Sequence, residues 1–164
     1  MMFTSILVAS AAALLSIPAA IAVPVADSFK TYSCIPGQKI TTKNQAINFA
    51  TFVQELYIEK DAATAFTDHA LESYIQHNPL LGQGRAATIA FLGANFPNWN
   101  VTVRHQGFDN GIGWVHWKLE GFGTARYDAV VDIFRYEGGC IAEHWDSIQA
   151  APALNETTNP YELI

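Results

Sequence analysis

Four apolar segments separated by turn residues follow one another between residues 101 and 148 of this 164-residue chain. They are rich in β-branched and aromatic side chains. The stretches between them, Asp109-Asn110-Gly111, Gly121–Thr124 and Gly138-Gly139, are typical of turns. The pattern predicts an antiparallel meander with short connections. Its predicted strands are residues 101–108, 112–120, 125–136 and 140–148.

Helices are predicted before these strands. Apolar side chains at helical spacing, such as Phe49 and Val53, predict a helix from Thr41 or Thr42 to about Lys60. Further elements are predicted at about 62–67 (a short helix), 74–78 (a short extended segment) and 85–95 (a helix). Helices followed by an antiparallel meander indicate the α+β class.

The composition suits one compact domain, because half of the residues are hydrophobic and only 15% are charged. We assign residues 42–149 to this domain, 23–41 to an irregular extension and 150–164 to a tail. The formal net charge is −6 and no cluster of basic residues occurs. The sequence therefore predicts no nucleic-acid partner.

The N-terminus carries an unbroken run of apolar or small residues, Ile6–Ile17, followed by Ala20-Ile21-Ala22, which fits an A-x-A cleavage site. This pattern predicts a secretory signal peptide of residues 1–22 and a mature chain from about Val23. The alternative is a membrane anchor, but two prolines interrupt the apolar run and no basic stop-transfer segment follows. We therefore expect a secreted protein with no membrane partner after signal removal.

Two features agree with an extracellular location. The chain contains two cysteines, Cys34 and Cys140, and an even number of cysteines in an oxidising compartment predicts a disulfide bond. Asn100 and Asn155 each begin an Asn-x-Thr sequon, so both are predicted glycosylation sites.

The last predicted strand contains ionisable residues among apolar ones. Successive strand side chains point to opposite faces, so His144, Asp146 and Ile148 share one face. Ionisable groups on a half-buried strand cost free energy unless they are partnered. This placement marks a candidate site, although a structural ion pair has the same signature.

Several motifs, taken in order along the chain, are similar to those of the SnoaL-like proteins of the nuclear-transport-factor-2-like (NTF2-like) superfamily. They are Tyr74-Ile75-Gln76-His77-Asn78-Pro79, Gly84-Arg85, Val131–Arg135, and Glu143-His144-Trp145-Asp146 with Gln149. The resemblance covers roughly residues 43–149. It implies an α+β cone, in which about three helices pack on a strongly curved antiparallel sheet around a pocket.

The resemblance also implies a chemistry. SnoaL closes polyketide rings by aldol condensation without metal or cofactor, and its acid–base residues match Asp146 and His116 here. A carboxylate that lines an apolar cavity can take an acidic C–H proton next to a carbonyl. The related limonene epoxide hydrolases carry Arg-x-Asp where this chain has His116-Trp117-Lys118, which argues against epoxide opening. For both candidates a purely structural role stays open.

Other residues are candidates for contact with a small apolar or carbonyl-containing ligand. They are His77, Tyr74, Gln76, His144 and Trp114. The five histidines form no compact ligand motif with one another, so we predict neither a metal nor another cofactor. Asp132 and Arg135 are interpreted as a structural pair across strands.

Three functions remain open at this stage. The first is a cofactor-free enzyme of the aldol cyclase, isomerase or dehydratase type. The second is a non-catalytic extracellular binder of an apolar small molecule, and the third is a structural module without a pocket. A homodimer through the outer sheet face is also predicted, with an apolar patch formed by Val115, Trp117, Ile141 and Trp145.

Overall fold

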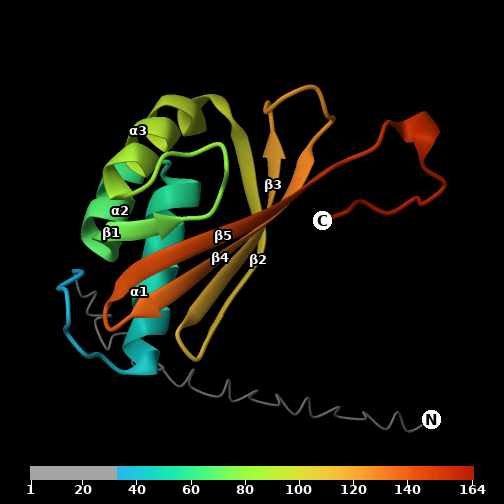
Figure 1. The fold of residues 1–164 in the computed structure, drawn as a ribbon. Coiled ribbons are helices and arrows are strands. Elements are labelled where there is room, and N and C mark those ends of the chain that lie inside the picture. The colour runs from blue at the N-terminus through green and yellow to red at the C-terminus, as the bar shows by residue number, and fades with distance from the viewer. Residues whose placement is uncertain (1–32) are drawn as a thin grey trace, which may run out of the picture.

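The computed structural model describes residues 33–164, in which helices precede a C-terminal run of strands (Figure 1). The predicted signal peptide and most of the 23–41 extension lie outside the described residues. The helical elements are α1 (Thr42–Val53), the π-helical turn η1 (Gln54–Ile58), α2 (Ala62–His69), α3 (Arg85–Asn95), and the 3-10 turns η2 (Phe96–Asn98) and η3 (Leu154–Glu156). The strands are β1 (Ala70–Gln76), β2 (Asn100–Asp109), β3 (Ile112–Glu120), β4 (Asp128–Glu137) and β5 (Cys140–Ala150).

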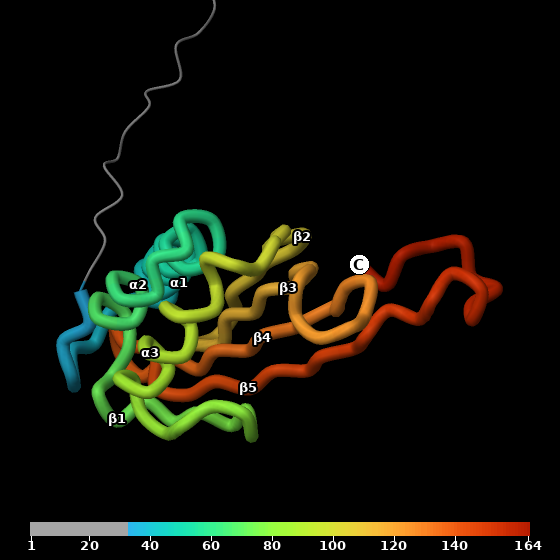
Figure 2. Tube along the Cα trace, turned by 90° about the horizontal axis from the view of Figure 1, so that it is seen from above, coloured from blue at the N-terminus to red at the C-terminus, as the bar shows by residue number. Residues whose placement is uncertain are grey.

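The five strands form one curved, unclosed sheet in the order β1-β5-β4-β3-β2. The strands β2 to β5 form the predicted antiparallel meander. The segment predicted as extended over 74–78 is instead a longer edge strand, which pairs in parallel with β5 (Figure 2). The three helices pack on one face of the sheet, as the α+β prediction requires (Figure 1). Within residues 33–164, no helix has the length and apolar character needed to cross a membrane.

Local sequence signals explain where the elements begin. The Thr41 side chain accepts a hydrogen bond from the backbone N–H of Asn44 at 3.2 Å and so caps α1. Asp61 caps α2 in the same way, through the N–H of Thr64 at 2.9 Å. The β2–β3 hairpin turns at Asn110 and Gly111, which both have positive φ, the conformation that a tight two-residue hairpin requires.

The first helix does not continue regularly to Lys60 as predicted. It widens after Val53 into the π-helical turn η1, where the N–H of Glu59 donates to the carbonyl of Gln54 at 3.0 Å. Leu56 and Tyr57 are buried in this turn. Turns of this kind are frequent near functional sites, because they re-aim the side chains that follow.

The core lies between the helices and the inner face of the sheet. Phe52 of α1 contacts Phe66 of α2 and Phe134 of β4, with ring centroids 5.3 and 5.0 Å apart. The helix α1 approaches the sheet so closely that a Cβ atom on Gly113 would lie 2.6 Å from the Phe49 ring. A larger residue at 113 would push α1 off the sheet.

The predicted Cys34–Cys140 disulfide is confirmed. The two Cα atoms are 4.7 Å apart, within the range that a disulfide allows. It ties the N-terminal segment to the start of β5, across 106 residues of sequence. In the chain-entropy model, closing a loop of this size stabilises the fold by roughly 4–5 kcal/mol. A disulfide of this kind is compatible with an extracellular protein.

Acidification should destabilise this fold through His69. His69 is 2% exposed and lies 3.1 Å from Glu55, but neither of its ring nitrogens makes a hydrogen bond within the described residues. Burial lowers the pKa of His69 from 6.5 to about 4, and burial raises that of Glu55. The folded state therefore binds fewer protons at His69 than the unfolded state, and stability is lost as the pH falls from 6.5 towards 4.

Urea unfolding at pH 7 and pH 4.5 measures this loss. We expect His69 to account for about 2–3 kcal/mol of the difference between the two pH values. The variant His69→Leu keeps the burial and removes the titration, so its stability should depend less on pH. An equal pH dependence in the two proteins would show that His69 does not control acid stability.

Candidate functional site

A cavity of about 80 Å³ lies between the helices and the inner face of the sheet. Most of its wall is apolar and aromatic, with Leu56, Phe66, Phe91, Leu92, Phe96, Trp99, Trp117, Leu119, Phe122, Val130 and Phe134 among the lining residues. Leu80 and Ile148 line it as well and are 65% and 42% exposed, so the cavity reaches the surface beside them. An apolar pocket with few polar groups is the usual form of a small-molecule site.

Apart from Thr88, whose hydroxyl donates to the carbonyl of Gly84, the polar residues in the wall form one group connected by hydrogen bonds, which we call the polar cluster. Its members are Tyr57, Tyr74, Gln76, Asn78, Asp132, His144 and Asp146. They come from η1, from β1 and the residues after it, and from the paired strands β4 and β5. The pocket therefore has one polar region within an apolar wall.

Asp132 is the centre of this cluster. Its Oδ2 accepts hydrogen bonds from the hydroxyl of Tyr57 and, at 2.7 Å, from Nε1 of Trp117. Its Oδ1 lies 3.3 Å from Nε2 of His144. Asp132 is only 6% exposed, so these three donors replace the water that the carboxylate loses on folding.

His144 joins Asp132 to Gln76. The Nδ1 atom of His144 lies 2.9 Å from Oε1 of Gln76, and the backbone N–H of Asn78 donates to the same oxygen at 2.8 Å. Both ring nitrogens of His144 thus face oxygen acceptors. His144 therefore links the amide of Gln76 to the carboxylate of Asp132.

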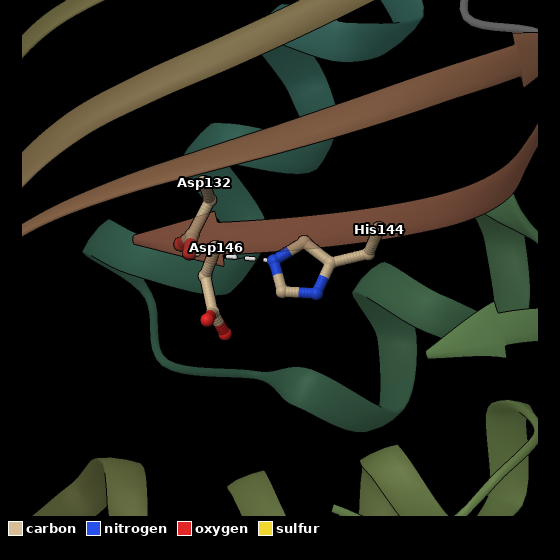
Figure 3. Close-up of side chains that lie close together, drawn as sticks. All are labelled: Asp132, His144 and Asp146. Atoms are coloured by element: carbon tan, nitrogen blue, oxygen red, sulfur yellow. Dashed lines mark ion pairs between the residues drawn. The ribbon is translucent and has the colours of Figure 1, made fainter. Parts of the chain in front are cut away.

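The Asp146 carboxylate has fewer hydrogen-bond partners than the Asp132 carboxylate. Its Oδ2 accepts a hydrogen bond from Nδ2 of Asn78, which is its only hydrogen-bond partner within residues 33–164. Figure 3 shows its carboxylate turned away from the ion pair that Asp132 makes with His144. The other oxygen of Asp146 is therefore open to a molecule in the pocket.

The two carboxylates lie directly opposite each other on neighbouring strands. Asp132 of β4 pairs with Asp146 of β5 in the antiparallel register, and both line the pocket. Like charges in such a pair are destabilising. The donors around Asp132 offset this cost, whereas Asp146 keeps an unsatisfied oxygen. Two carboxylates with such different surroundings, both lining one cavity, mark a candidate chemical site.

The polar cluster also contains a possible set of metal ligands. Within the described residues, atoms of Asp132, His144 and Asp146 lie within 4.8 Å of one another. A cation bound there would have to displace the contact between His144 and Asp132. Asp132 is moreover already held by Tyr57 and Trp117. The hydrogen bonds therefore favour the existing ion pair over a metal.

Tyr74, Gln76 and His144 line the pocket, as expected, and His77 does not. Nε2 of His77 lies 2.7 Å from Oε1 of Glu143, and its ring stacks on Trp145 with centroids 5.0 Å apart. The prediction that His77 contacts a ligand together with Gln76 is therefore wrong. Successive side chains of an extended chain point to opposite faces, so two neighbouring residues cannot both face the pocket. Gln76 faces inward and His77 faces outward.

The prediction that His116 and Asp146 share one pocket is also wrong. The inner face of β3 carries Val115, Trp117 and Leu119, all at most 4% exposed. His116 alternates with these residues, lies on the outer face and stacks on His105, with centroids 5.8 Å apart. Trp114 has the same phase and is 39% exposed, so it cannot contact a ligand in this pocket.

The apolar patch predicted on the outer face of the sheet is also wrong for most of its residues. Val115, Trp117 and Ile141 are buried on the inner side, and of the four predicted residues only Trp145 lies outside. The register shift between Arg135 and Tyr136 puts Ile141 out of simple alternation. Trp114, Ile133 and Trp145 instead lie side by side across the outer face, as successive pairing partners. A homodimer through this face stays a prediction.

Three important residues were missed or misread in the sequence. Asp132 was paired with Arg135, but Arg135 donates to Oε2 of Glu143 at 2.7 Å on the outer face. Trp117, which donates to Asp132, was predicted on the outer face, and Tyr57, the other donor, was not among the predicted site residues. The alternation of Val130, Asp132 and Phe134 on one face of β4 was the available signal.

No family model matches the sequence, and no curated protein matches it. Solved structures do match. An NTF2-like protein of unknown function from Mesorhizobium loti superposes with a TM-score of 0.56 at 15% identity, over 69% of this chain and 98% of that one. A proposed isomerase of the SnoaL-like family from Agrobacterium tumefaciens superposes with a TM-score of 0.51 at 16% identity, over 65% of this chain and 98% of that one.

A third similar structure is an NTF2-like protein of unknown function from Burkholderia xenovorans. Its TM-score is 0.54 at 14% identity, over 65% of this chain and 83% of that one. The chain therefore has the NTF2-like fold, and the expected resemblance to NTF2-like and SnoaL-like proteins is confirmed at the level of structure. At these identities the fold does not fix the function, which must be argued from the site.

Proposed function

We propose that this protein is a secreted, cofactor-independent enzyme that moves a proton on an apolar carbonyl compound, as an aldol cyclase, isomerase or dehydratase does. One observation carries the proposal. Asp146 presents an open carboxylate oxygen inside an apolar pocket, beside a second carboxylate that is fully hydrogen-bonded. A SnoaL-like protein of related fold, the proposed isomerase from Agrobacterium tumefaciens, is consistent with it.

The first chemical step is a proton transfer to Asp146. The open oxygen takes a proton from a carbon next to the carbonyl, and the electron pair of that C–H bond moves onto the carbonyl oxygen to give an enolate. The protonated Asp146 then returns the proton to carbon in an isomerisation. In a ring closure, the enolate carbon attacks a second carbonyl and the new alkoxide takes the proton. Acid–base assistance of this kind accelerates a reaction roughly 10²–10⁴-fold.

Secretion is part of the proposal. It is supported by the apolar run and cleavage pattern at the N-terminus and by the disulfide. Asn100 and Asn155 are both exposed, so glycosylation at these positions remains a prediction that suits the same location. The ligand we propose is a small apolar carbonyl compound, because the pocket wall is largely aromatic and aliphatic.

Deuterium exchange tests the proposed chemistry without knowledge of the natural substrate. The mature protein is incubated in D₂O with simple ketones such as acetophenone, and loss of the α-proton signal is followed by NMR. We expect exchange above the buffer rate and no change when EDTA is added. Ketones that bind without any exchange would contradict the enzyme proposal and favour the non-catalytic binder.

A further inference from the structure

The hydrogen bonds of the polar cluster leave two groups open to a ligand. Asp132, His144 and Gln76 are engaged with one another and with their neighbours. Within the described residues, the remaining oxygen of Asp146 lacks a donor and the hydroxyl proton of Tyr74 lacks an acceptor. The pocket therefore offers one hydrogen-bond acceptor and one donor to a bound molecule.

The orientation of Gln76 determines where the Tyr74 proton can go. Oε1 of Gln76 accepts from the backbone N–H of Asn78 at 2.8 Å and from His144 at 2.9 Å, so this end of the amide is the oxygen. The other end is Nε2, which donates to the Tyr74 hydroxyl oxygen at 3.3 Å. Because Tyr74 accepts from Gln76, its own proton is free for a different partner.

Tyr74 is also placed to use this proton in the pocket. It is 1% exposed to solvent and lines the cavity. Burial raises the pKa of its hydroxyl, and the charges of Asp132 and Asp146 raise it further, so the group stays protonated. A buried hydroxyl without an acceptor costs free energy, which a ligand oxygen would recover.

The charge of the lining limits what the ligand can be. None of the lining residues in the described part of the chain is Lys or Arg, whereas two of them are aspartates. A carboxylate or phosphate group would enter next to Asp132 and Asp146 without any lysine or arginine to pair with it. The aromatic wall equally disfavours a ligand with many polar groups.

We propose that the substrate is an uncharged, apolar ketone or aldehyde whose carbonyl oxygen accepts a hydrogen bond from Tyr74 while its α-carbon faces Asp146. This inference rests on the proposed function and names its substrate class and its second catalytic group. As Asp146 removes the α-proton, negative charge develops on the carbonyl oxygen, where the Tyr74 hydroxyl holds it. Tyr74, and not the predicted His116, is thus the partner of Asp146 in this pocket.

Four probes of similar size test the substrate class. They are acetophenone, its oxygen-free analogue α-methylstyrene, the anion benzoate and the cation 1-phenylethylamine. By NMR titration we expect acetophenone to bind about 3- to 10-fold more tightly than α-methylstyrene, because one neutral hydrogen bond contributes about that factor in affinity. Benzoate should bind most weakly of the four. Equal binding of the first two, tightest binding of either charged probe, or no binding of acetophenone would overturn the proposal.

Two variants test the role of Tyr74. Tyr74→Phe should reduce acetophenone affinity to that of α-methylstyrene and leave α-methylstyrene binding unchanged. The control is Tyr136→Phe, because the Tyr136 hydroxyl is buried and has no hydrogen-bond partner among the described residues, yet does not line the pocket. It should change neither affinity. Equal effects of the two variants would overturn the assignment of Tyr74.

The carbonyl group itself reports the hydrogen bond without any turnover. With ¹³C-labelled acetophenone, binding to the wild type should move the carbonyl resonance downfield, and Tyr74→Phe should abolish this shift. Deuterium exchange is measured on the same samples. A carbonyl shift without exchange would support the hydrogen bond from Tyr74 and contradict the proposed enzyme activity. Exchange without a shift would support the enzyme activity and contradict the role of Tyr74.

Discussion

Replacing Asp146 with Asn is expected to lower the rate of α-proton exchange about 10²–10⁴-fold while the protein stays folded and binds its ligand. The amide oxygen of the new side chain can still accept the hydrogen bond from Asn78, so the local shape is kept. What is lost is the carboxylate oxygen that faces the pocket. The loss should therefore appear in kcat, with KM nearly unchanged.

Two control variants make this result specific. Asp128→Asn changes a buried aspartate that does not line the pocket, and it should retain full exchange activity. His116→Ala removes the histidine of the outer face and should also leave activity unchanged. If Asp146→Asn exchanges protons as fast as the wild type, Asp146 is not the base. If it unfolds, Asp146 is a structural residue.

The overall fold was predictable because its signals are local. Alternating apolar residues, turn residues and helix caps each act within a few residues, and β3 was predicted with the bounds that the structure has. The first strand was not, since its register is set by parallel pairing with β5, about 70 residues later. Its middle, Glu72 and Ser73, also gives no apolar alternation.

The phase of β3 was harder to predict, and this caused the errors at His116 and Trp114. Both faces of this strand carry large apolar residues, with Trp114 on one and Val115 and Trp117 on the other. Alternation alone cannot decide which face is inside in such a case. The packing of the helical elements determines which face of β3 is buried, because Trp117 packs against Tyr57 and Phe96, which come from elements far away in sequence.

The site was predicted in part. The shared face of His144 and Asp146 follows from the two-residue period of a strand and is confirmed, since both line the pocket. The role of Asp132 was missed because it was paired with Arg135, although an odd separation of three residues puts the two on opposite faces of β4. The network around Asp132 also depends on Tyr57, whose position in the π-helical turn no local pattern indicated.

Replacing Asp132 with Leu should therefore destabilise the protein by about 3–5 kcal/mol at pH 7. The substitution keeps the branching of the side chain but leaves the Tyr57 hydroxyl and the Trp117 N–H without an acceptor, and it removes the carboxylate that faces His144. Urea unfolding measures the change. Asp128→Asn is the matched control: Asp128 lies on the same strand and is equally buried at 6% exposure. Because burial raises the pKa of Asp128, the neutral Asn should be tolerated there.

A double-mutant cycle separates this network from simple loss of packing. Tyr57→Phe alone removes one donor to Asp132 and should cost about 1 kcal/mol. In the Asp132→Leu background the same change should cost nothing or stabilise, because the hydroxyl then has no acceptor to lose. Additive effects would mean that the hydrogen bond between Tyr57 and Asp132 contributes nothing. In that case Trp117 and His144 alone would hold Asp132, which is still one partner more than the Asp146 carboxylate has among the described residues.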